Sequence, residues 1–440
     1  MSLFHRITGH AAIRSAAGYA GVTSFVKVMA FLKEAVVAAI FGVSGAMDAY
    51  LMALVVVGFP VQLFINALNP VFVREYLRVE SEHGLKAADA FVWSSARLFV
   101  GVLAAILVAW LLVLPAVIRL VGHGLATSQR DLVVFTVYGL TAYYFLTGLN
   151  LLGAAALQAQ KRFALGGIIP VATPVVMIVT VLVAGADLRA LVAALTAGTF
   201  LEVVLTFSRF HRLQDPADAT KLPTRRWARR LAAGTLSLLP GTAIGGLLPI
   251  IEQSIASNLG KGAISALGYA AKLPATISSL LVTAVGVTIL PYFVEMLARE
   301  QVADCRRLYG RYVALAVIGG ATVSVVCILV SEQFVHLAFE RGAFTSQDTA
   351  TVSGIQQAYL LQIPGALVGM LSVRLIAARG AYVALTSANL AIVPVVGLLQ
   401  WWLASRFGAP GIALGTSLGV TLSAAALAAL ALWVTRGNRQ

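Results

Sequence analysis

The sequence predicts an all-α polytopic membrane protein with about twelve transmembrane helices. Of its 440 residues, 59% are hydrophobic and only 11% are charged, and the mean hydropathy is +0.89. A soluble domain is roughly 45–50% apolar and cannot bury this much apolar surface. Because the apolar runs extend along the whole chain, the composition excludes a soluble enzyme, a disordered protein and a single-span receptor.

Apolar runs of about 20 residues or more mark the expected helices. They lie at 13–40, 49–73, 90–114, 132–157, 163–185, 188–209, 231–258, 264–295, 309–331, 349–373, 381–404 and 410–435. Several runs exceed the minimum for one crossing, so tilted helices are expected. Six prolines inside the runs should kink their helices, because proline lacks the N–H that the helix needs. They are Pro60, Pro170, Pro174, Pro240, Pro249 and Pro274.

The distribution of lysine and arginine predicts the orientation in the membrane. Of the 32 basic residues, 22 lie in or next to the segments on the side of the N-terminus, and 6 lie on the opposite side. Cytoplasmic loops carry the excess of positive charge, so both termini are expected in the cytoplasm. The net charge of +14 is therefore explained by topology, and no nucleic-acid partner is expected.

The chain divides into two halves that resemble each other. We expect a six-helix lobe over 1–210, a basic cytoplasmic linker over 211–230 and a second six-helix lobe over 231–440. Landmarks of the first half recur in the second at offsets of 218, 219 and 221 residues, namely Gly42 with Gly260, Tyr50 with Tyr269 and Pro70 with Pro291. Six helices per repeat make the two lobes parallel, and transporters built in this way bind substrate between their lobes.

Three lysines within the apolar runs are the candidate substrate-binding residues. An ionisable group at membrane depth costs roughly 2.5–3.5 kcal/mol on insertion scales, so each needs a reason. Lys27 and Lys33 lie in the first run, and Lys272 lies in the second half. Their positive charges suit a phosphate or diphosphate group in a central cavity. The alternative is that these long side chains extend to the membrane surface.

Four acidic residues are candidates for a coupling site or for charge pairs with the lysines: Glu34, Asp48, Glu202 and Glu252. Glu34 is seven residues from Lys27 and shares its helix face. Asp48 could instead cap the helix that it begins, and Glu202 and Glu252 could be buried partners of hydroxyl groups. The coupling ion, H⁺ or Na⁺, stays open. We expect no cofactor or metal site, because the six histidines show no ligand spacing.

Several motifs of other protein classes are missing from the sequence. It contains no P-loop for ATP hydrolysis, and the loop after the second run lacks the GxxxDRxGRR-like pattern of major facilitator proteins. The outer loops are short, at roughly 8–18 residues, and leave little room for a catalytic domain. A transporter without enzymatic activity is therefore expected.

Three segments resemble one family of membrane transporters. KEAVVAAIFGVSGAMDAY (33–50) is similar to the first-hairpin signature of the MurJ/MviN lipid II flippases, within the multidrug/oligosaccharidyl-lipid/polysaccharide (MOP) exporter superfamily. GYAAKLPATISSLLVTAVGVTILPYFVEM (268–296) resembles the matching segment of the second lobe. LAFERGAFTSQDT (337–349) resembles the family's outer loop before the tenth helix. The similarity covers essentially the whole chain.

The resemblance implies a V-shaped pair of six-helix bundles that moves a lipid-linked saccharide across the inner membrane by alternating access. Such a flippase serves peptidoglycan or polysaccharide biosynthesis for the cell wall. The basic cavity positions of the family correspond to Lys27, Lys33 and Lys272, and its acidic position at the start of the second helix corresponds to Asp48. The implied partners are the lipid-linked saccharide, membrane lipids and the glycan-synthesis machinery.

The sequence departs from the family pattern at three places. Lysines replace the arginines that line the family's cavity, which removes bidentate diphosphate recognition. A basic residue of the second helix is replaced around Val61 and Gln62. The chain ends after the twelfth run, whereas these flippases add two helices for the polyprenyl tail. We therefore expect a relative that carries lipid II or an exopolysaccharide precursor. The alternative is a MATE-like drug or cation antiporter, which would favour an acidic cavity.

Overall fold

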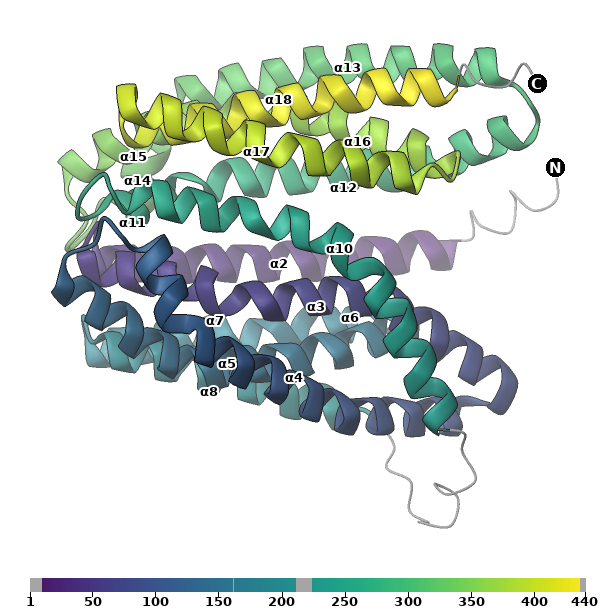
Figure 1. The fold of residues 1–440 in the computed structure, drawn as a ribbon, viewed down its shortest axis with the longest axis horizontal. Coiled ribbons are helices and arrows are strands. Elements are labelled where there is room, and N and C mark those ends of the chain that lie inside the picture. The colour runs from purple at the N-terminus through teal and green to yellow at the C-terminus, as the bar shows by residue number, and fades with distance from the viewer. Residues whose placement is uncertain (1–9, 161, 211–223, 436–440) are drawn as a thin grey trace. The chain divides into compact units, whose positions relative to one another are not determined.

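The computed structural model describes residues 10–160, 162–210 and 224–435, and all regular secondary structure in these residues is helical (Figure 1). Ten helical segments of this part of the chain are long and apolar enough to cross a membrane. The predicted all-α membrane fold is confirmed, and the number of twelve crossings stays a prediction.

The helices follow one another with short connections. They are α2 (His10–Phe41), α3 (Gly45–His83), α4 (Leu85–Val121), α5 (Thr127–Ala159), α6 (Phe163–Ile168), the 3₁₀ turn η1 (Ile169–Val171), α7 (Ala172–Ala184), α8 (Leu188–Phe207), α10 (Thr224–Ala256), α11 (Ala263–Ala270), α12 (Lys272–Ala298), α13 (Val302–Leu329), α14 (Ser331–Phe339), α15 (Ser346–Leu360), α16 (Ile363–Ala378), α17 (Tyr382–Phe407) and α18 (Ala409–Val434).

Each predicted apolar run coincides with one helix or with a group of consecutive helices. The run at 163–185 is divided into α6, η1 and α7, and Pro170 lies in the 3₁₀ turn. The sequence predicted a kink at Pro170, and the break there follows from the chemistry of proline, which has no N–H to donate and restricts the residue before it. Pro60, where a kink was also expected, lies inside the continuous helix α3. Pro174 lies inside α7.

The expected linker at 211–230 is described only in part. Residues 211–223 lie outside the described residues, whereas residues 224–230 form the first turns of α10. Trp227 explains why this basic segment is helical and packed: it is 3% exposed and its ring meets the ring of Phe91 edge-on, with the centroids 5.3 Å apart.

The chain forms two compact units. The N-terminal unit consists of Met1–Phe41, Met52–Ile118 and Ser128–Ala243, and the C-terminal unit consists of Gly42–Leu51, Arg119–Thr127 and Ile244–Gln440. Helices α3, α4 and α10 each contribute residues to both units. The division into two six-helix lobes stays a prediction.

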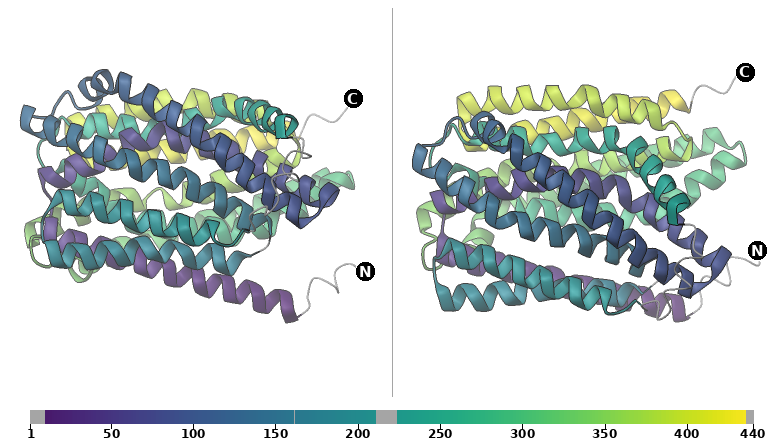
Figure 2. Two further views of the ribbon diagram at one scale, coloured as in Figure 1. Left: turned by 90° about the horizontal axis from the view of Figure 1, so that it is seen from below. Right: turned by 60° about the horizontal axis from the view of Figure 1, so that its bottom comes forward.

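In the N-terminal unit, the long helix α2 packs against α6 and α7 (purple in Figure 2). The first part of α10 packs closely on α3, since a Cβ atom added at Gly234 would lie 2.7 Å from the Cγ1 atom of Val71. The ring of Phe72 stacks on that of Phe91 at 5.3 Å. A small residue on α10 and aromatic residues on its neighbours therefore fix the position of this helix within the unit.

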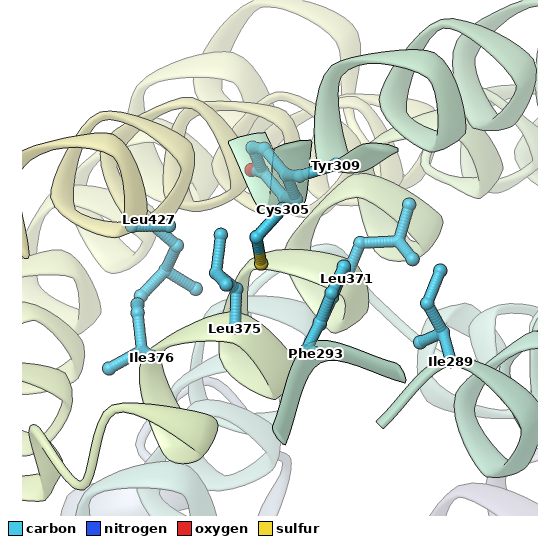
Figure 3. Close-up of a cluster of buried hydrophobic side chains, with 9 residues drawn as sticks. Ile289, Phe293, Cys305, Tyr309, Leu371, Leu375, Ile376 and Leu427 are labelled. Carbon is cyan, nitrogen blue, oxygen red and sulfur yellow. The ribbon is translucent and has the colours of Figure 1, made fainter. Parts of the chain in front are cut away.

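In the C-terminal unit, α12, α13, α16 and α18 enclose an apolar core (Figure 3). Its labelled members are Ile289, Phe293, Cys305, Tyr309, Leu371, Leu375, Ile376 and Leu427. The only polar group needing a partner in this set, the Tyr309 hydroxyl, lies 2.7 Å from the Ser372 hydroxyl. Helices α17 and α18 run side by side in the same unit (Figure 1).

Candidate functional site

The Asp48 carboxylate lies at the start of α11, far from it in sequence. Asp48 belongs to the first turn of α3 and is 1% exposed. Its Oδ2 atom accepts a 2.5 Å hydrogen bond from the N–H of Gly262, and its Oδ1 atom accepts one of 2.7 Å from the N–H of Ser265. These N–H groups have no partner within α11, and a negative charge also stabilises the positive end of the helix dipole. Asp48 therefore caps α11 rather than its own helix.

A second set of contacts holds the turn between α2 and α3. Gly42 has a φ of +57°, and a Cβ atom added there would overlap the carbonyl oxygen of Ala343. The Tyr269 hydroxyl donates to the carbonyl of Gly42 at 3.4 Å. The Tyr269 ring packs against Phe339 and Phe344, with centroids 5.6 and 5.7 Å apart. A glycine is required at position 42 for both backbone conformation and space.

These contacts join the three segments that carry the family resemblance. We call the group the Asp48 junction, and it consists of Gly42, Asp48, Gly262, Ser265, Tyr269, Phe339, Ala343 and Phe344. All of its members belong to the C-terminal unit. Sequence reasoning missed Gly262 and Ser265. Their signal was a pair of glycines, Gly260 and Gly262, directly before a helix, both with positive φ.

A polar network orders the segment between α14 and α15, next to the junction in sequence. The Glu340 carboxylate accepts hydrogen bonds from the hydroxyls of Ser346 at 2.7 Å and Thr349 at 2.6 Å. His336 Nδ1 lies 2.9 Å from Glu340 Oε2. These donors lower the pKa of Glu340 to about 2, with Thr349 the largest contributor. Thr345 and Asp348 form a reciprocal capping box at the start of α15.

Two of the three candidate lysines lie in the N-terminal unit and one lies in the C-terminal unit. Lys33 Nζ forms an ion pair with Glu34 Oε1 at 2.6 Å, and their side chains are 19% and 15% exposed. Lys27 lies on the same helix, α2, in the N-terminal unit. Lys272 is the first residue of α12, in the C-terminal unit. The structure pairs Lys33 with Glu34, and a common cavity for all three lysines stays a prediction.

Glu202 is part of a buried polar network in the N-terminal unit. It lies on α8, is 6% exposed and accepts a 2.7 Å hydrogen bond from Asn150 Nδ2 on α5. It also accepts a 3.2 Å bond from the N–H of Thr173, the second residue of α7. Thr206 donates to Asn150 Oδ1 at 2.9 Å. Glu202 thus caps α7 across a helix interface, as Asp48 caps α11.

Glu252 on α10 has a hydroxyl partner in the C-terminal unit, since the Tyr359 hydroxyl on α15 donates to its Oε1 atom at 2.6 Å. This bond matches the alternative role expected for Glu252, that of a partner of a hydroxyl group. Among the described residues, no group of three or more His, Cys, Asp or Glu side chains could hold a metal ion.

Comparison with known proteins places the chain in a family. A family model described as "Lipid II flippase MurJ" matches residues 37–436. The chain belongs to this MurJ family. A probable lipid II flippase MurJ of Synechocystis is 25% identical over 430 residues, covering 93% of this chain and 80% of the relative. One of Rhizobium tropici is 23% identical over 355 residues, covering 78% of this chain and 66% of the relative, just under two thirds of its length.

Solved structures share the fold of this MurJ family member. A lipid II flippase MurJ in an inward closed conformation has a TM-score of 0.66 at 18% identity, covering 93% of this chain and 86% of that one. An inward-facing multidrug resistance MATE family transporter of the MOP superfamily has a TM-score of 0.76 at 12% identity, covering 97% and 100%. At these identities the likeness shows the fold alone, and it confirms the predicted MOP-type architecture.

Proposed function

We propose that this protein translocates a polyprenyl-diphosphate-linked saccharide, lipid II or another glycan precursor, across the inner membrane by alternating access. The observation that carries the proposal is the meeting of three segments at the Asp48 junction, in a chain whose family model matches over 37–436. The relatives named above are described as lipid II flippases. Both termini are proposed to lie in the cytoplasm, where the protein would meet glycan-synthesis enzymes.

The lysines are proposed to bind the diphosphate. A diphosphate leaves water only if positive charge compensates its own, and Lys27, Lys33 and Lys272 would supply three such charges. Glu34 neutralises part of the charge of Lys33, so exchange of the Lys33 ammonium between Glu34 and the substrate diphosphate would tune affinity. Binding that is strong in one state and weak in the other allows release on the far side.

The Asp48 junction is proposed to act as a gate of the alternating-access cycle. Its two hydrogen bonds tie the first turn of α3 to α11 within the C-terminal unit. Helix α3 continues from this turn through residues 52–83 of the N-terminal unit. Breaking the two bonds would free α3 to move relative to α11. The acids Glu202 and Glu252 are the proposed sites for a coupling proton or Na⁺.

A complementation experiment tests this function. The gene is expressed in a bacterium depleted of its own lipid II flippase, with Lys27→Ala, Lys272→Ala and the exposed-site control Lys86→Ala alongside. The wild type and Lys86→Ala should restore growth, and the two cavity variants should not, at equal membrane levels. Full rescue by both cavity variants would overturn the role of the lysines. Failure of the inserted wild type would overturn lipid II as the substrate and leave another lipid-linked glycan to assay.

A further inference from the structure

The N-terminal unit contains an apolar cavity of about 210 Å³ between α3, α4, α5 and α10. Phe64, Phe72 and Phe99 line it with aromatic faces, and the rings of Phe64 and Phe99 stack at 5.6 Å. Only Ser95 and Thr235 contribute polar side chains to the wall of this cavity. It therefore suits the hydrocarbon part of a ligand.

The cavity opens at the surface of the unit. Leu98 and Leu236 line it and are 46% and 65% exposed, whereas Phe72 and Phe99 at its inner wall are 0% and 4% exposed. Exposed apolar side chains on membrane-spanning helices face lipid or other apolar chains. A chain lying in the membrane could therefore enter the cavity between α4 and α10.

Thr235 points to a ligand rather than to simple packing. Threonines in these helices commonly donate to the carbonyl four residues earlier, as Thr136 does to Leu132 and Thr141 to Val137. The Thr235 hydroxyl lines the cavity, belongs to a residue that is 2% exposed and has no hydrogen-bond partner. A buried donor without a partner is costly, and the π-face of a carbon–carbon double bond is a weak acceptor for it.

Basic residues lie one helical turn from the cavity. Glu75, three residues after Phe72 on α3, is 3% exposed and sits between Arg74 and Arg230 at 4.0 and 3.6 Å. Both distances exceed a hydrogen bond, and Glu75 Oε2 has no hydrogen-bond partner. The side chains of Arg74 and Arg230 are 71% and 32% exposed. They therefore present donors to an anionic group next to the apolar cavity.

We propose that this cavity is a loading site for an isoprenoid diphosphate lipid, with an isoprenoid segment between α3, α4 and α10 and the diphosphate at Arg74 and Arg230. The inference rests on the proposed function and assigns the lipid moiety of the same substrate. Aromatic walls and an unpartnered hydroxyl favour an unsaturated, methyl-branched chain over a saturated acyl chain. The site precedes transfer of the diphosphate to the lysines.

The test measures equilibrium binding of radiolabelled undecaprenyl diphosphate, without a saccharide, to the full chain in phosphatidylcholine nanodiscs. Ala232→Trp blocks the cavity mouth, and Ala233→Trp is the matched control, since Ala233 is exposed on the same helix and does not line the cavity. We expect Ala232→Trp to weaken binding at least tenfold and Ala233→Trp to change it less than twofold. Thr235→Val, which keeps the shape of the side chain, should weaken binding about threefold.

Two further arms identify the ligand and separate this inference from the proposed function. Arg74→Gln with Arg230→Gln should weaken diphosphate binding tenfold and leave undecaprenol binding unchanged, and excess dioleoyl phosphatidic acid should not displace the probe. Displacement by phosphatidic acid would mean a general phospholipid site and overturn the proposal. Equal binding by the wild type and Ala232→Trp, with loss in Lys27→Ala, would overturn the loading site alone. No binding to the wild type would overturn both.

Discussion

The Oδ1 atom of Asp48 accepts a 2.7 Å hydrogen bond from the backbone N–H of Ser265, 217 residues farther along the chain. Gly262 donates to the other carboxylate oxygen, so both oxygens are engaged. Hydrogen bonds to a charged group contribute about 1.5–3 kcal/mol each to stability. The free energy contributed by two such bonds is large enough to stabilise one state of a transporter and small enough for the bonds to be broken in its cycle.

Asp48→Asn should reduce both stability and transport. The amide has one acceptor oxygen, so one N–H of the α11 start loses its partner and faces an NH₂ group. We expect a free-energy loss of about 1–3 kcal/mol and at least a tenfold loss of transport. Ser265→Ala is the control, because it keeps the backbone N–H and removes only the hydroxyl, which donates to the Gly262 carbonyl at 3.1 Å. Equal melting temperatures and transport for the two variants would contradict the capping role.

Gly42→Ala should destabilise the protein more than Gly84→Ala does. Both glycines have positive φ, which costs a residue with a Cβ atom about 1–2 kcal/mol. At Gly84 the new Cβ atom meets nothing within 4 Å, whereas at Gly42 it overlaps the Ala343 carbonyl. Thermal unfolding in detergent measures the difference. A smaller effect at position 42 than at 84 would show that the turn relaxes without strain.

Glu202→Leu should lower the free energy of unfolding by about 1–3 kcal/mol for each donor that it leaves without an acceptor. These donors are the Asn150 amide and the Thr173 N–H. Glu202→Gln keeps one acceptor oxygen and should cost less. Denaturation of the two variants in the same detergent gives the comparison. If the glutamine variant unfolds as readily as the leucine variant, the network depends on the charge and not on acceptor geometry.

Acid should loosen the segment between α14 and α15. The pKa of Glu340 is lowered to about 2 by its hydrogen bonds, whereas the pKa of a glutamate in the unfolded chain is about 4.3. The stabilisation is therefore complete above the unfolded pKa and is lost as the pH falls from about 4.3 towards 2. Hydrogen exchange of residues 336–349 should accelerate in this range, after correction for intrinsic rates. A Glu340→Gln variant should lack this step, and the same step in both proteins would exclude Glu340 as its source.

The sequence predicted the membrane helices because apolar runs of sufficient length have few alternatives in a bilayer. It also predicted a kink at Pro170, where the 3₁₀ turn η1 divides the helix, and the kinks expected at the other prolines stay predictions. It missed α14 and the extension of α3 to His83. The α3 extension is too polar to register as a span, and the helical state of α14 depends on packing that buries Val335 and Phe339.

The site was predictable only where neighbours in sequence are neighbours in space. Lys33 and Glu34 were both singled out as neighbours in sequence, but the sequence placed Glu34 on one face with Lys27, whereas the structure shows an ion pair of Glu34 with Lys33. Asp48 was identified as a functional acid, but its partners were not, because they are backbone N–H groups more than 200 residues away whose only sequence mark is the glycine pair before α11. Likewise, the unpartnered state of Thr235 depends on how α10 packs within the N-terminal unit.

The most direct test of the account is translocation by the purified protein in liposomes. A fluorescent polyprenyl-diphosphate disaccharide is placed in both leaflets, and a membrane-impermeant quencher reports the fraction that becomes accessible. We predict that the wild type exposes nearly all of the probe, that Asp48→Asn and Lys27→Ala expose only the outer-leaflet half, and that a fluorescent phosphatidylcholine is not moved. Equal movement of phosphatidylcholine, or no movement of the saccharide lipid by any form of the protein, would contradict the proposed function.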